Sequence, residues 1–233
     1  MATVSDDKVQ NGAFDWIKQH KKDLFLKFAD LSFYPQDPYP TTVFMAGSPG
    51  AGKTEFSRRL AEQFKQKPVI VDADEIRKII PGYTGKKAYL FQKAATKGVN
   101  LLYDYVCKKG LNVIIDGTFA YAQPVENIKR SLKYNRNIEI YFLYQDPVIS
   151  WKFTKVREQK EFRNVPKNVF INAYLKSIEN VTLVKNEFGN KIKLNLVIKD
   201  FTKSLQTLHL NTSEIEKLLP KLYTDKELTK ILN

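Results

Sequence analysis

One short segment of the chain has the residue types and spacing of a phosphate-binding loop. It runs Gly47, Ser48, Pro49, Gly50, Ala51, Gly52, Lys53, Thr54 and fits the pattern GxxxxGK[ST]. Its three glycines allow the backbone to curl so that successive N–H groups point into one anion-binding hollow. In such loops the lysine reaches the β- and γ-phosphates, and the final hydroxyl binds Mg²⁺. We therefore expect these eight residues to bind a nucleoside triphosphate, with Lys53 as a catalytic cation and Thr54 as a metal ligand.

Acidic residues end two apolar segments further along the chain. Asp72 and Asp74 close the segment PVIVDAD, and Asp116 closes NVIID. In an extended segment Asp72 and Asp74 point to the same side, and a carboxylate there can accept the proton of an attacking hydroxyl. We assign this general-base role to Asp74 and a substrate-binding role to Asp72; the alternative for Asp74 is a helix N-cap. Asp116 is expected to bind the metal, and Thr118 to contact metal, phosphate or substrate.

Positive charge gathers in residues 129–167, which contain ten Lys and Arg against four Asp and Glu. Phosphoryl transfer needs positive charge on the equatorial oxygens of the transferred group. Arg157 and Arg163 follow the fourth predicted strand, so we expect both to act as catalytic lid arginines. The alternative for either one is an ordinary solvated helix face.

Strands and helices must alternate to position these groups. Apolar strand candidates begin near residue 41 and recur at 68–74, 111–118, 138–146 and 194–200. Helical patterns cover 14–31, 53–66, 86–109, 124–134 and about 149–187. This alternation is typical of a parallel sheet covered on both faces, with ligands bound at the carboxyl ends of its strands. The prediction is an α/β P-loop NTPase fold, a three-layer αβα arrangement with about five strands, plus N- and C-terminal helices.

The expected organisation has one main domain. Residues 1–40 form an N-terminal helical extension, 41–205 a P-loop kinase domain with a lid near 150–167, and 206–233 a helical tail packed on the same domain. In the tail, Ser213 and Asp225 are candidate N-caps of two short helices.

Composition excludes several classes of protein. The 233 residues include one Cys and two His, which rules out an internal disulfide and disfavours Cys- or His-rich metal centres. The apolar runs are shorter than the ~20 residues that span a bilayer, and the N-terminus lacks an apolar signal region. We expect a cytoplasmic protein without a membrane partner. The net charge of +13 fits ordinary solubility; it also fits a nucleic acid, an anionic membrane or an acidic small molecule as partner, and charge alone does not separate these three.

Four ordered segments, GSPGAGKT, VDADEIRKIIPGY, NVIIDGT and VREQKEFRNVP, resemble the zeta-toxin family of P-loop kinases over about residues 40–200. The resemblance implies transfer of the γ-phosphate of ATP or GTP to a sugar hydroxyl of UDP-N-acetylglucosamine, with Mg²⁺ as cofactor and an antitoxin protein as partner. It also implies Asp74 as general base and Arg157 and Arg163 as phosphate clamps. Asp116 replaces the Glu of the family's EGT motif, and Thr118 matches its Thr.

Two departures from the family pattern concern the acceptor. Ile80 stands where the family has His, and Asn100 falls where the family has an acidic substrate-binding residue. Asn can accept a hydrogen bond but cannot act as a base. The expected substrate is thus UDP-N-acetylglucosamine or a related anionic, nucleotide-linked metabolite. A polynucleotide or nucleoside kinase, with nucleic acid as a less expected partner, and a P-loop switch module without an acceptor are the alternatives.

Overall fold

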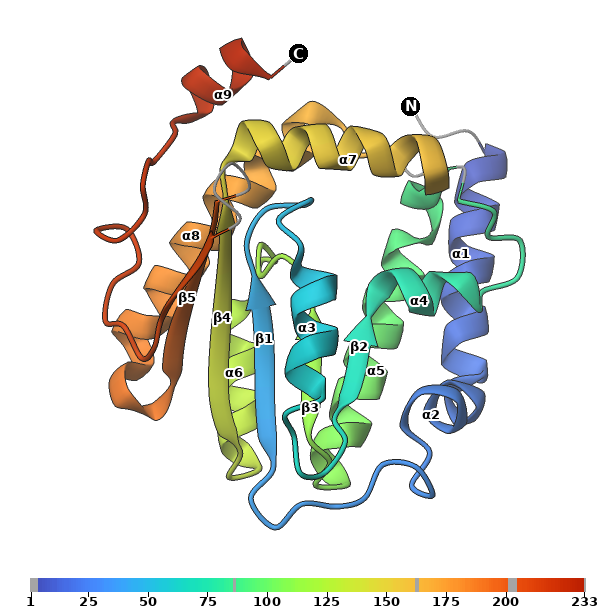
Figure 1. Cartoon of the computed structure of the whole chain (residues 1–233). Helices are drawn as coiled ribbons and strands as arrows, with labels where there is room; N and C mark the ends of the chain where they lie inside the picture. Colours follow the sequence, from blue (N-terminus) through green and yellow to red (C-terminus); the bar gives the residue numbers. More distant parts are fainter. Residues whose placement is uncertain (1–3, 86, 162–163, 201–204, 233) are drawn as a thin grey trace.

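The computed structural model describes residues 4–85, 87–161, 164–200 and 205–232, and its centre is a sheet. Within these residues the strand order is β2-β3-β1-β4-β5-β6 (Figure 1). The strands are β1 (Thr41–Ala46), β2 (Val69–Asp72), β3 (Val113–Asp116), β4 (Asn137–Gln145), β5 (Lys193–Asp200) and β6 (Leu205–His209). The first five are mutually parallel, and β6 pairs antiparallel with β5 at the edge. The predicted α/β fold is confirmed, with one strand more than expected.

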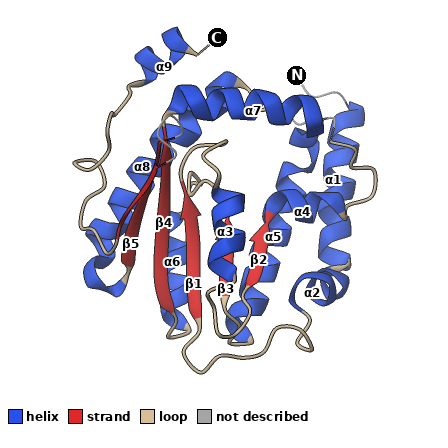
Figure 2. Cartoon of the chain, in the orientation of Figure 1, coloured by secondary structure: helices blue, strands red, loops and turns tan. Residues whose placement is uncertain are grey.

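Helices cover both faces of the sheet, as Figure 2 shows. The α-helices are α1 (Val4–Gln19), α2 (Lys21–Ala29), α3 (Lys53–Ala61), α4 (Ala73–Lys78), α5 (Gln92–Lys108), α6 (Pro124–Lys133), α7 (Pro147–Glu161), α8 (Lys167–Phe188) and α9 (Asp225–Ile231). Short 3₁₀ turns, η1 (Ala88–Phe91) and η2 (Gly189–Lys191), precede α5 and follow α8.

Alternate side chains of the central strand β1 divide the core in two. Val43 and Met45 belong to a small apolar cluster that Phe56 of α3 joins. Phe44 and Ala46 point to the other face and belong to a larger cluster, which includes residues of α1, α5, α6 and α8. This alternation is the period of two that any strand imposes on its side chains. The sheet is therefore the middle of three layers.

Several helices differ in extent from the sequence prediction. The helix expected at 14–31 begins earlier and divides at His20, whose ring Nδ1 lies 2.9 Å from the carbonyl oxygen of Trp16. The helix expected at 149–187 is two helices, because Pro166 precedes α8 and disfavours helical backbone at Val165. The expected helix at 53–66 ends at Ala61.

The C-terminal tail holds one α-helix among the described residues rather than two. Ser213 begins no helix, and Thr224 rather than Asp225 is the N-cap of α9. Thr224 Oγ1 accepts a hydrogen bond from the Glu227 N–H, while the Glu227 carboxylate accepts one from the Thr224 N–H. This reciprocal capping box satisfies two backbone donors and fixes where the helix starts.

The carboxyl ends of three neighbouring strands converge at one edge of the sheet. β1 leads into the phosphate-loop segment, and Asp72 and Asp116 are register partners at the ends of β2 and β3. Figure 1 shows α7 lying across this edge. The fold thus brings the predicted loop, both strand-end acids and the predicted lid helix to the same side of the sheet.

Candidate active site

The loop between β1 and α3 has the curled backbone that its glycines predicted. Gly47, Gly50 and Gly52 have φ angles of 121°, 77° and 79°, which favour glycine. A Cβ at Gly47 would lie 2.2 Å from the carbonyl oxygen of Leu143, and one at Gly50 would lie 2.2 Å from that of Ser150. The backbones of β4 and α7 therefore press directly against the loop. Since α3 begins at Lys53, the positive end of its dipole adds to the loop N–H groups.

Lys53 lies inside this loop. Its side chain is largely buried, and its ammonium group donates hydrogen bonds to the carbonyl oxygens of Gly47 at 3.0 Å and Ser48 at 2.6 Å. The cation is thereby held against the backbone at the start of the loop. This position suits a phosphate-binding lysine.

The two strand-end aspartates do not form the extended pair that we expected. Asp72 ends β2 and caps α4, with its Oδ1 accepting a hydrogen bond of 2.7 Å from the Asp74 N–H. Asp74 lies in the first turn of α4, so the alternative that it caps the helix is also wrong. A D-A-D segment fits a strand end as well as a helix start, and the capping preference of Asp72 decides between them. The carboxylate of Asp74 is consequently available to other side chains rather than used as the helix cap.

Two arginines from different helices contact Asp74. Arg77, one turn later on α4, forms an ion pair and hydrogen bond with its Oδ1. Arg157 of α7 places Nη2 3.6 Å from its Oδ2, and this arginine is about half exposed. The lid helix thus brings one predicted arginine to the predicted base. The second, Arg163, lies outside the described residues.

The predicted metal ligands lie on adjacent elements. The hydroxyl Oγ of Ser57 lies 3.0 Å from the carbonyl oxygen of Thr54 and 3.3 Å from Asp116 Oδ2, which links α3 to the end of β3. Among the described residues no three His, Cys, Asp or Glu side chains gather as a protein-only metal cage. Mg²⁺ beside a triphosphate needs few protein ligands, because phosphates and water complete its octahedral shell. One hydroxyl and one carboxylate therefore fit a Mg²⁺ bound with nucleotide.

The other two predicted substrate contacts are placed differently. The Thr118 carbonyl accepts a hydrogen bond of 3.2 Å from the Gly47 N–H, so Thr118 borders the loop. Asn100, in the middle of α5, hydrogen-bonds instead to the Thr96 carbonyl at 3.0 Å and to Arg130 Nη1 at 3.2 Å. Its amide is used between α5 and α6 rather than against the aspartates.

Sequence reasoning missed two cations beside the site. Arg77 was recognisable by its i,i+3 spacing from Asp74, but its burial was not. Lys199, at the end of β5, donates a hydrogen bond of 3.3 Å to the Gly52 carbonyl, and burial lowers the pKa of its ammonium group. The predicted strand end at 200 was the available signal for Lys199.

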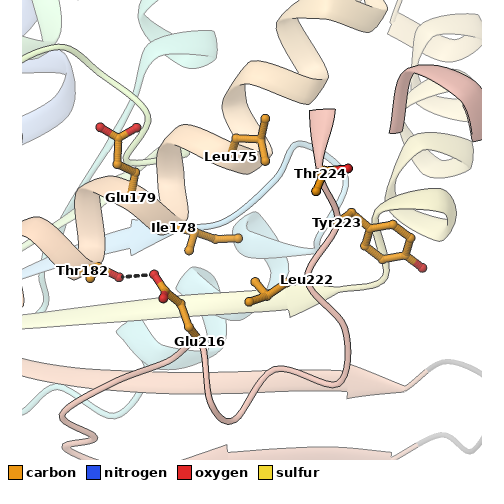
Figure 3. A pocket seen from close by; sticks show the side chains of 8 residues that line it. All are labelled: Leu175, Ile178, Glu179, Thr182, Glu216, Leu222, Tyr223 and Thr224. Atoms are coloured by element: carbon orange, nitrogen blue, oxygen red, sulfur yellow. Dashed lines mark hydrogen bonds between the residues drawn. The ribbon is translucent and has the colours of Figure 1, made fainter. Parts of the chain in front are cut away.

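A separate pocket of about 420 Å³ lies between α8 and the tail (Figure 3). Leu175 and Ile178 of α8 face Leu222, and a hydrogen bond of 3.0 Å joins Thr182 to Glu216. None of the predicted site residues lines it.

In the described part of the chain, no helix has the length and apolar character to cross a membrane.

The sheet order, the loop after β1 and the acid at the end of β3 define a protein of the P-loop NTPase fold. The family model described as zeta toxin matches residues 27–213, which is most of the chain. The chain therefore belongs to the zeta toxin family of phosphotransferases, and the resemblance drawn from its four segments is confirmed.

Solved structures agree with this fold. A structure from work on the PezAT chromosomal toxin-antitoxin system of Streptococcus pneumoniae is 17% identical, with a TM-score of 0.67 over 98% of this chain and 93% of the other. A complex of AvrRxo1-ORF1 and -ORF2 with ATP is 12% identical, with a TM-score of 0.62 over 97% and 73% of the two chains. The same complex with sulphate ions is 12% identical, with a TM-score of 0.60 over the same shares. No curated protein matches the chain.

Proposed function

We propose that this protein is a kinase that transfers the γ-phosphate of ATP to a hydroxyl group of a small anionic acceptor. The observation that carries the proposal is the meeting of three parts at one sheet edge: the loop around Lys53, the carboxylate of Asp74, and Arg157 at 3.6 Å from that carboxylate. A switch module needs the loop but has no use for a base and a lid arginine. The similar structure solved with ATP supports ATP as the donor.

Each group has a role that its position permits. The loop N–H groups and Lys53 bind the phosphates, and Asp74 accepts the proton of the attacking hydroxyl. Arg157, half exposed on α7, can turn from Asp74 toward the transferred phosphoryl group, where Arg163 is proposed to join it. Thr54 and Asp116 would hold Mg²⁺, which neutralises charge developing on the phosphate oxygens. Asp72 orients Asp74 through its backbone N–H.

We propose UDP-N-acetylglucosamine, or a related nucleotide-linked metabolite, as the acceptor. Family membership supports a sugar nucleotide, and the net charge of +13 favours any anionic substrate. Asn100 stands where the family has a carboxylate, and its amide oxygen accepts a hydrogen bond from the cation of Arg130. Such a pair suits neutral hydroxyls and a phosphate better than it suits a cationic group. The same net charge supports a polynucleotide kinase as the second candidate.

A protein antitoxin is the proposed partner. One similar structure comes from work on a toxin-antitoxin system, and another is a complex of two proteins. By this analogy the chain is the toxin, and its partner restrains the kinase.

The test is ADP release from ATP and Mg²⁺ with a panel of acceptors, UDP-N-acetylglucosamine foremost, together with nucleosides and oligonucleotides. We expect acceptor-dependent turnover that Lys53→Ala abolishes and that Lys65→Ala, an exposed change beyond α3, leaves intact. Turnover with oligonucleotides alone would favour the polynucleotide kinase. Nucleotide binding without turnover in the presence of any acceptor would favour the switch module and contradict the proposal.

A further inference from the structure

We propose that Arg77 is a positioning residue that fixes the carboxylate of Asp74 in the orientation needed to accept a proton. The inference rests on the proposed kinase function. It concerns a residue that the phosphate-loop, metal and lid assignments leave without a role.

Arg77 is held at both ends of its guanidinium group. Nη1 binds Asp74 Oδ1 on the same helix, and Nη2 binds Gln92 Oε1 at the start of α5. The residue is 3% exposed, so solvent does not compete for these bonds. A planar guanidinium anchored on two elements has little freedom to rotate, and the oxygen that it binds is fixed with it. The other carboxylate oxygen, Oδ2, is then directed toward Arg157 and the sheet edge.

Burial of Arg77 is unfavourable in itself. Desolvation lowers the pKa of its guanidinium, with Tyr83 and Asp72 acting in the opposite direction. Its Nε atom is buried without a hydrogen-bond partner among the described residues. A buried ion pair is often no more stabilising than apolar packing, and Ile76 and Ile80 on either side show that apolar side chains fit this part of the core. A stabilising role alone is thus a poor account of the residue.

The same helix contains a natural comparison. Lys78 and Glu75 have the same i,i+3 spacing as Arg77 and Asp74, with a separation of 2.6 Å, but both are exposed. Exposed pairs of this kind contribute little. Lys78 therefore serves as the matched control, because its ion-pair partner on α4 is the exposed Glu75.

The kinetic test compares Arg77→Met, Arg77→Lys, Gln92→Ala and Lys78→Met. We expect Arg77→Met to lower kcat by about 10²-fold with the KM for ATP little changed, since a shift of ~1 Å in a reacting group costs that much. Arg77→Lys should restore part of kcat by returning the charge. Gln92→Ala, which leaves the ion pair but removes its second anchor, should give an intermediate loss even if Arg77→Met folds poorly. Lys78→Met should behave as wild type. A wild-type kcat in Gln92→Ala and Arg77→Lys, or a loss confined to KM, would overturn the inference.

A second measurement does not depend on turnover. The shifts in urea midpoint of Asp74→Asn and Arg77→Met should be non-additive in the double variant, because the partners are in direct contact. The shifts of Asp74→Asn and Lys78→Met should add. Additive shifts for Asp74 and Arg77 would overturn the pairing itself. Non-additive shifts with a wild-type protein that phosphorylates no acceptor would instead contradict the proposed function and, with it, the catalytic role of the pair.

Discussion

Arg157 contacts a different group from the one that the sequence assigned to it. The sequence assigned it to the phosphates, and in the structure its Nη2 lies 3.6 Å from Asp74 Oδ2. Because Arg157 is about half exposed, we expect its side chain to exchange this carboxylate for a more highly charged phosphoryl group when substrate binds. The proposed base and the proposed lid arginine are therefore neighbours in the structure.

Replacing Arg157 by Ala should lower kcat by about 10²-fold or more while changing ATP affinity far less, because its charge is used mainly in the transition state. Steady-state kinetics with a separate nucleotide-binding titration measure both effects. Lys152→Ala, an exposed change on the same helix, is the control. A loss of ATP affinity with unchanged kcat would contradict a transition-state role.

The role of a residue could be predicted when it depends on neighbours in the sequence rather than on tertiary packing. The loop from Gly47 to Thr54 is a contiguous motif whose backbone angles follow from its own glycines. The extended pair expected of Asp72 and Asp74 was wrong, because the strand ends at Asp72 and a helix begins at the next residue. Arg77 was missed because burial of a charge depends on the packing of α4 against α5, which no local pattern reports.

At the scale of elements, the phosphate loop and α7 are joined by a close backbone contact. Gly50 has a φ of 77°, and a Cβ there would lie 2.2 Å from the carbonyl oxygen of Ser150 on α7. The helix that carries Arg157 thus depends on a glycine in the loop for its approach. Gly82 offers a contrast, because its φ is 82° but no heavy atom lies within 4 Å of a Cβ.

Gly50→Ala should therefore weaken ATP binding and destabilise the fold by more than the ~1–3 kcal/mol that a strained left-handed residue costs. Gly82→Ala should show the backbone strain alone and leave ATP affinity unchanged. Urea unfolding and a nucleotide titration on both variants separate the two effects. Equal behaviour of the variants would show that the contact with α7 has no consequence.

The order and type of the main elements followed from apolar strands that alternate with helical patterns. The ends of these elements could not be predicted in this way, because they depend on single residues. Pro166 separates α7 from α8, and Thr224 rather than Asp225 is the N-cap of α9. The antiparallel strand β6 contains no apolar run from which it could be predicted. Its pairing with β5 is a tertiary contact that the sequence pattern does not contain.

At the scale of the whole molecule, the tail beyond the family match connects to both α7 and α8. Tyr223 donates a hydrogen bond of 2.7 Å to Asp146, whose other oxygen accepts one from the Val148 N–H in the first turn of α7. Lys167, the first residue of α8, donates to the carbonyl oxygen of Thr229 in α9 at 3.1 Å and to that of Leu232, the C-cap of α9, at 2.7 Å. The tail therefore bridges the start of α7 and the start of α8.

Tyr223→Phe should lower the free energy of unfolding by about 1.5–3 kcal/mol, the range for a lost hydrogen bond to a charged group. Burial, followed by the contact with Asp146, raises the pKa of the Tyr223 phenol, so the hydroxyl stays protonated and donates across the neutral range. Urea unfolding measures the loss, and Tyr39→Phe, at a strongly exposed position, is the control. Equal stability of the two variants would contradict the role given to the tail.

The central claim is that this site phosphorylates an acceptor hydroxyl with Asp74 as base. Mass spectrometry of the products of ATP, Mg²⁺ and UDP-N-acetylglucosamine, with wild-type protein and Asp74→Asn, tests it most directly. We predict that wild type yields an acceptor heavier by one phosphoryl group. We predict that Asp74→Asn yields none while still binding ATP. A phosphorylated acceptor formed at near wild-type rate by Asp74→Asn would contradict the assignment of the base, and an unmodified acceptor with wild-type protein would contradict the proposed substrate.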